Sequence, residues 1–172
     1  MTNFDYLKDC EGVKHLYELC CEVECRQTSD PGTSALYARN VLDWIVQAIY
    51  RLEDIGDANG KSLFQLMNDD KFVRYINDAS MMQTLHYIRK IGNIGAHNPS
   101  SVKRNESYFV LRQLHGAVGA VLMKFGLISS FPDFDDNLIP KKPRLRVAPT
   151  ATAKSVSDEV MTVKATPKQG SL

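Results

Sequence analysis

The chain has 172 residues, a formal net charge of +1 and 44% apolar residues. This length suits one domain with a tail, and the near-neutral charge argues against a protein that binds nucleic acid through its overall charge. No apolar run is long enough to span a bilayer, and the acidic N-terminus lacks the basic-then-apolar pattern of a signal peptide. We therefore expect a soluble, cytoplasmic protein.

The four cysteines all fall within the first 25 residues, at Cys10, Cys20, Cys21 and Cys25. Cys21 and Cys25 are one helical turn apart and, with His15, would offer ligands to a metal. This spacing is not a zinc-finger pattern, however, and no second ligand pair follows downstream. A cytosolic chain keeps its thiols reduced, so the sequence favours free thiols, with no metal and no cofactor.

Apolar residues recur every three or four positions in four long segments, which is the spacing of amphipathic α-helices. The first and second are separated by the sequence SDPG, expected to be a turn, so that Thr33 or Ser34 caps the second helix. Asp78 or Ser80 is expected to cap the third helix, and Gly126 to end the fourth. The expected long helices are 12–27, 33–55, 80–97 and 102–125, and two short helices are expected at 62–69 and 70–78.

No run of alternating apolar residues predicts a strand. Four main helices and two short ones, joined by short loops, predict an all-α bundle of antiparallel neighbours. We assign residues 1–128 to this bundle, 129–149 to an extended strap and basic linker, and 150–172 to a disordered tail with no apolar periodicity.

Glycines interrupt two of the long helices. Each glycine inside a helix costs about 1 kcal/mol relative to alanine, so Gly92 and Gly95 suggest the close approach of another backbone or a ligand. Gly116 and Gly119 suggest tight helix packing in the same way.

Polar residues form a stripe along the third long helix, within the sequence LHYIRKIGNIGAH. Arg89, Asn93 and His97 follow one another at four-residue intervals and so drift only about 40° per step around the helix. They could hold a neighbouring helix in place, contact a ligand or carry out catalysis, and the structural role is favoured. In the second helix, Arg39 either pairs with Asp43 at i,i+4 or faces this stripe, and the sequence favours the first.

A basic cluster follows the bundle at Lys141, Lys142, Arg144 and Arg146. It could contact a phosphate backbone, but such a run is more often a solvated linker.

The chain resembles the helical domain of unknown function at the N-terminus of type I restriction enzyme R subunits and related helicases. The resemblance covers about residues 3–140, and its most specific part is RKIGNIGAH, where the family shows R-K-x-G-N-x-A-A-H. Full R subunits continue into a nuclease domain and a helicase motor, but this chain has no P-loop and no acidic nuclease motif. It is therefore either a stand-alone version or a fragment. The segments that carry the resemblance are NFDYLKD, SDPGTSALYARNVLDWIVQAIY, LFQLMNDDKF, LHYIRKIGNIGAH and FPDFDDNLIP.

That family is in turn similar to the HEPN superfamily of helical bundles, many of which are metal-independent ribonucleases with an R-N-x-x-x-H motif. The resemblance puts Asn93 and His97 in the Asn and His places of this motif, while Gly92 occupies the Arg place and Arg89 lies one turn earlier. In such enzymes the arginine stabilises phosphate charge and the histidine acts as a general acid or base.

The resemblance implies a HEPN-like bundle that serves as a non-catalytic accessory domain in a DNA restriction or defence system. Its expected partners are restriction-system subunits, a helicase motor, or DNA or RNA. One alternative is a HEPN-type ribonuclease that uses Arg89, Asn93 and His97. The other is a scaffold that forms a homodimer.

Overall fold

The computed structural model describes residues 1–141, and over this range the protein is helical, with no strand. The predicted all-α fold is therefore confirmed. The tail expected at 150–172 lies outside the described residues. Within 1–141 no helix has both the length and the apolar character needed to cross a membrane. The α-helices of the described part are α1 (Lys14–Arg26), α2 (Pro31–Leu52), α3 (Leu63–Met67), α4 (Asp70–Ile76), α5 (Ala79–His97) and α6 (Arg104–Lys124), with 3₁₀ turns η1 (Asp5–Leu7), η2 (Pro99–Ser101) and η3 (Asp136–Leu138).

The helices lie where the apolar spacing predicts them, but α2 begins earlier than expected. Its N-cap is Asp30, whose side chain accepts a hydrogen bond from the backbone N–H of Thr33 at 3.1 Å. Pro31 occupies the first turn, where its fixed φ suits a helix and its missing N–H has no cost. The prediction that Thr33 or Ser34 caps this helix is therefore wrong, because Pro31 and Gly32 belong to the first turn of the helix and not to a loop before it.

Side chains also cap the starts of α3, α4 and α5, where the cap of α4 is Asp69. Ser62 and Gln65 form a reciprocal capping box at the start of α3, and Asp78 caps α5 by accepting from the N–H of Met81 at 3.0 Å. At the end of α6, Gly126 has a φ of +71°, and the N–H of Leu127 donates back to the carbonyl of Leu122. This is the glycine C-terminal motif that the sequence predicts.

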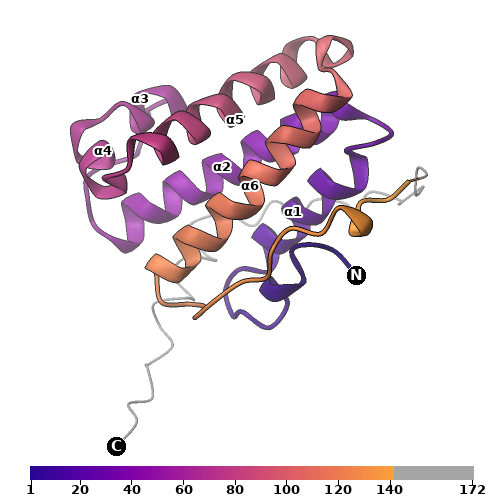
Figure 1. Ribbon diagram of the computed structural model, residues 1–172. Coiled ribbons are helices and arrows are strands. Elements are labelled where there is room, and N and C mark those ends of the chain that lie inside the picture. Colours follow the sequence, from indigo (N-terminus) through magenta and orange to yellow (C-terminus); the bar gives the residue numbers. More distant parts are fainter. Residues whose placement is uncertain (142–172) are drawn as a thin grey trace, which may run out of the picture.

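Helix α2 is the centre of the bundle, with α1, α5 and α6 packed around it (Figure 1). Because three helices surround it, it is apolar over most of its circumference. Trp44 and Tyr50 on this helix are both only 2% exposed, and the hydroxyl of Tyr50 donates to the carbonyl of Leu66 in α3 at 2.9 Å. The short helices α3 and α4 cover one end of the α2–α5 pair (Figure 1).

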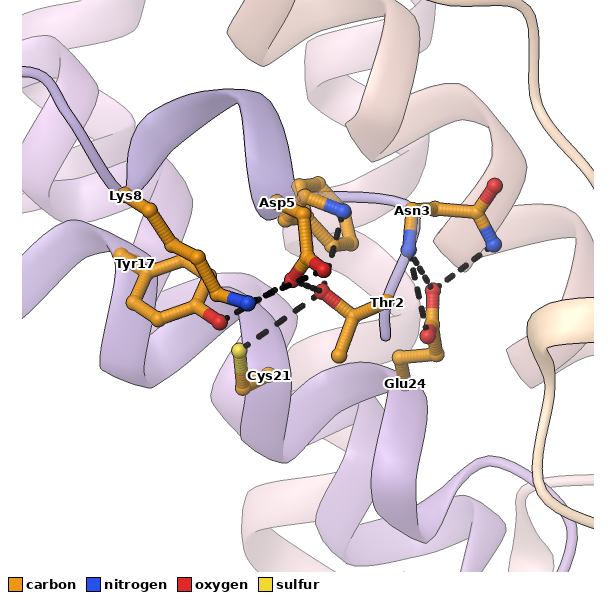
Figure 2. A network of polar contacts seen from close by, with 8 residues as sticks. Thr2, Asn3, Asp5, Lys8, Tyr17, Cys21 and Glu24 are labelled. Atoms are coloured by element: carbon orange, nitrogen blue, oxygen red, sulfur yellow. Dashed lines mark hydrogen bonds and ion pairs between the residues drawn. The ribbon is translucent and has the colours of Figure 1, made fainter.

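The N-terminal residues join α1 to the segment that follows α6, and Figure 2 shows their contacts with α1. Asn3 donates from its backbone and side-chain nitrogens to the buried carboxylate of Glu24, at 2.8 to 3.3 Å. The same amide exchanges two hydrogen bonds with the backbone of Asp135, at 3.0 and 2.7 Å. One asparagine therefore joins the N-terminus, α1 and the C-terminal segment.

The segment from 131 to 139, which we call the strap, runs along α6 as an extended chain interrupted by η3 (Figure 1). Phe131 fills the place of a missing side chain, since a Cβ built on Gly119 would lie 2.5 Å from its ring. The close packing predicted at Gly119 thus involves an aromatic ring. At Gly116 the prediction is wrong, because a Cβ there would meet nothing within 4 Å.

Candidate functional site

Helices α2 and α5 meet along a seam that has no room for side chains at its centre. A Cβ built on Gly92 would lie 2.4 Å from the Cβ of Arg39 and 2.9 Å from the carbonyl oxygen of Ala35. A Cβ on Gly95 would lie 2.4 Å from the carbonyl oxygen of Gly32. Both glycines of α5 therefore allow the backbone of α2 to approach, which is the close contact that the sequence suggests.

Arg39 faces α5 along this seam. Its Cβ and Cγ pack on Gly92, and no ion pair with Asp43 is found among residues 1–141. Burial raises the pKa of the Asp43 carboxyl, and the charge of Arg39 opposes that rise only in part. The surface pairing of Arg39 with Asp43 that the sequence favours is thus not seen. Arg39 instead takes the alternative position, in which it faces the helix that carries Arg89.

Arg89 lies on the same flank of α5, against the short helix α3. Its guanidinium carbon is 4.9 Å from the centroid of the Phe64 ring, within cation–π distance. Phe64 itself is 53% exposed, so the ring shields one side of the guanidinium from water. Burial, together with the charge of Arg89, lowers the pKa of His86 one turn away.

Both arginines carry a buried donor that has no partner. Within residues 1–141, Nε of Arg39 and Nε of Arg89 are inaccessible to solvent and make no hydrogen bond. A buried donor without an acceptor costs about 1–3 kcal/mol. The Cβ and Cγ of Arg39 pack on Gly92, which is three residues from Arg89 in α5.

Asn93 and His97 continue the polar stripe away from these arginines. Asn93 is half-buried, and its side chain makes no hydrogen bond within the described part of the chain. The expected cross-linking of buried backbone groups by this amide is therefore not seen. His97 is the last residue of α5 and is exposed, about 12 Å along the helix axis from Arg89.

Sequence reasoning missed Phe64, which forms the outer wall beside Arg89. A helix of five residues gives no apolar periodicity. The only signal in the sequence is the capping box of Ser62 and Gln65, which fixes where α3 begins.

The remaining predicted site residues lie elsewhere. Lys141 is exposed at the end of the described chain, while Lys142, Arg144 and Arg146 fall outside it. Within residues 1–141 the four cysteines form no disulfide, and burial raises the pKa of Cys20. In residues 1–141 no three His, Cys, Asp or Glu side chains are grouped so as to hold a metal ion.

Three comparisons of this chain, with models of protein families, with curated proteins and with solved structures, found no match. The seam between α2 and α5 is therefore interpreted from its own chemistry.

Proposed function

We propose that this chain is a non-catalytic interaction domain of a DNA restriction or defence system similar to those of type I restriction enzyme R subunits. The proposal takes the fold to be a HEPN-like bundle that acts in the cytoplasm. Its surfaces dock to other subunits, to a helicase motor or to nucleic acid. The sequence resemblance over residues 3–140 supports the assignment to a restriction or defence system. The seam between α2 and α5 supports the docking role.

The observation that carries the proposal is the pair of buried, unpartnered Nε donors at Arg39 and Arg89. Both arginines are only half-buried, so a carboxylate of a partner protein can reach their side chains. A change of side-chain rotamer on docking would then let each Nε donate to it, in the bidentate geometry that guanidinium groups favour. Arginine next to an exposed aromatic ring, as Arg89 lies next to Phe64, is also typical of the residues that dominate binding energy at interfaces. We therefore assign a partner carboxylate to this position.

The same geometry favours docking over the ribonuclease alternative. Catalysis would require Arg89 and His97 to act on one phosphate, but the guanidinium is held over Phe64 and the histidine lies about 12 Å away along the axis. Gly92, which occupies the arginine place of the HEPN motif, packs on Arg39. A symmetric dimer built on this seam would place the same positive donors from both copies in one interface, which favours a different protein as partner.

The proposal is tested by expressing the tagged chain together with the modification, specificity and motor subunits of a type I restriction system from the same organism. We expect at least one of these subunits to co-purify with the chain at a fixed ratio. If none does, in the presence or absence of DNA, the docking proposal fails.

Incubation with an unstructured RNA in the presence of a chelator separates the ribonuclease alternative. We expect the RNA to stay intact. Cleavage by the parent protein that is absent from His97→Ala would contradict a non-catalytic role and favour the HEPN-type ribonuclease.

A further inference from the structure

A second surface feature lies away from the seam, where the end of α1, the start of α6 and the strap meet. It is a depression of about 490 Å³, a volume within the usual range of small-ligand sites. Its lining combines two cations, two hydroxyl groups, one carboxylate and one aliphatic side chain. These residues are Thr28, Arg104, Tyr108, Asp136, Ile139 and Lys141.

The strap side of this depression is held in place by hydrogen bonds. The hydroxyl of Tyr108 donates to Oδ1 of Asp136 at 2.6 Å, and the neighbouring Asp135 is bound to Asn3 through its backbone. Ile139 is the last residue of the strap and Lys141 lies two residues further on, and both line the depression together with Arg104.

The charge of the depression is positive. Arg104 uses one Nη2 hydrogen bond to the carbonyl of Thr28, at 3.0 Å, and its guanidinium has further donors to offer. The negative charge of Asp136 interacts with the positive charge of Arg112, which also donates to the Tyr108 hydroxyl at 3.2 Å. Arg104 and Lys141, both exposed, therefore remain as uncompensated cations.

We propose that this depression binds a phosphate group of single-stranded nucleic acid, with Arg104 and Lys141 contacting the phosphate and Tyr108 contacting the adjoining base or sugar. This site goes beyond the proposed protein-docking seam and uses different residues.

The lining favours a single strand over a duplex. A concave site with an aromatic side chain and Ile139 can contact an unpaired base or its sugar, and such groups are accessible in single strands. A duplex offers mainly its phosphates to the rim. The binding expected here is consequently electrostatic, sensitive to salt and weakly dependent on sequence.

The test is fluorescence anisotropy with a short labelled single-stranded DNA of mixed sequence, the RNA of the same sequence, and the corresponding DNA duplex. The full chain should bind both single strands more tightly than the duplex. The Arg104→Gln, Lys141→Gln double variant should lose about tenfold in affinity at low salt, and its slope of log affinity against log salt should fall by about 1.4, that is, about 0.7 for each lost phosphate contact. A preference for DNA or RNA identifies which single strand is the ligand.

The matched control is Arg74→Gln with Lys90→Gln, which removes the same two charge types from exposed positions on α4 and α5. It should bind as the parent does. Arg89→Met, in the docking seam, should also keep oligonucleotide affinity, which separates this inference from the proposed function.

Three results would overturn the proposal: no binding by the parent, equal losses in the control and the double variant, or full affinity in the double variant. Because Arg104 also bonds to Thr28, Lys141→Gln alone is measured as well. Lys141 has no hydrogen bond within the described residues, so its single variant should fold normally and show about half the change in salt slope.

Discussion

Asn3 and Asn93 have the same side chain in opposite surroundings. Asn3 is 3% exposed and joins the carboxylate of Glu24 to the backbone of Asp135. Asn93 is half-buried, and its side chain makes no hydrogen bond within residues 1–141. The difference shows that the position of an amide in the sequence pattern does not determine its structural contribution. The stripe at 89–97 was the conspicuous signal, yet the amide that joins distant parts of the chain is near the N-terminus.

We expect Asn3→Ala to lower the free energy of unfolding by about 2–4 kcal/mol. It removes the side-chain hydrogen bond to the buried carboxylate of Glu24 and leaves the backbone N–H and carbonyl of Asp135 without the Asn3 amide. Asn93→Ala should change it by less than about 0.5 kcal/mol. Urea midpoints of the two variants check this pair. A large loss for Asn93→Ala alone would show that its amide has a structural partner after all.

His115 gives the fold a pH dependence of definite sign. Its ring is 3% exposed and 5.5 Å from the rings of Phe4, Phe131 and Phe134, and burial lowers its pKa below the ordinary value of 6.5. The folded protein therefore favours the neutral ring, while the unfolded chain takes up a proton first as the pH falls. This contribution is constant above 6.5 and is lost as the pH drops below that value.

We expect the urea midpoint of the parent to fall between about pH 7.5 and 5.5, and to fall less in His115→Gln, which cannot titrate. His97→Gln, at an exposed position, is the control and should keep the pH dependence of the parent. Burial also raises the pKa of Glu24, which gives the stability a pH dependence of the opposite sign. This effect is the same in all three proteins, so it cancels when their pH dependences are compared. The same slope in parent and His115→Gln would exclude this role for His115.

At the scale of the element, the seam between α2 and α5 depends on the absence of side chains. Gly95 and Gly116 both lie inside helices, but a Cβ on Gly95 would lie 2.4 Å from a backbone oxygen of α2, and one on Gly116 would meet nothing. The cost of an added methyl group is thus set by the neighbouring helix.

Gly95→Ala should destabilise the protein by about 1–3 kcal/mol, because the helices must move apart. Gly116→Ala should stabilise it by about 0.5–1 kcal/mol, through the higher helix propensity of alanine. Thermal midpoints of the two variants give the signs directly. If Gly95→Ala left the thermal midpoint unchanged, α2 and α5 would not be in close contact at this position.

The helices were predictable because apolar spacing reports burial directly, and that pattern held over α1, α2, α5 and α6. The start of α2 was not predictable, because a proline such as Pro31 is as compatible with a turn as with the first position of a helix. A glycine inside a helix predicted close approach but not the identity of the neighbouring group: Gly92 contacts another helix, and Gly119 contacts an aromatic ring of the strap. For the candidate site, spacing found Arg89 and Asn93, but the contact of Arg39 with Gly92 and the ring of Phe64 depend on how distant elements pack.

At the scale of the whole molecule, the two ends of the described chain hold each other in place. Tyr6 and Phe4 from the N-terminus and Phe131 and Phe134 from the strap surround His115. The strap therefore belongs to the folded bundle, although it has no apolar periodicity of its own.

Deletion of all residues after Ser130 should lower the thermal midpoint by at least about 5 °C, because it exposes this aromatic cluster and releases Asn3. Deletion after Pro149 should leave it unchanged within about 2 °C, since the removed sequence has no apolar stripe to dock. Differential scanning calorimetry of both truncations checks the boundary. Equal thermal midpoints for the parent and for the protein that ends at Ser130 would mean that the strap adds no stability.

The proposed docking depends most on the two unpartnered arginine donors, Nε of Arg39 and Nε of Arg89, and the dissociation constant for the co-purified subunit tests them directly. Arg39→Met with Arg89→Met removes the donors while keeping unbranched side chains, and should weaken binding by at least about 100-fold, as expected for buried charge-assisted hydrogen bonds. Lys90→Met, at an exposed position beside Arg89, is the control and should bind within about threefold of the parent. Equal affinities for the parent, the double variant and the control would contradict docking through this seam.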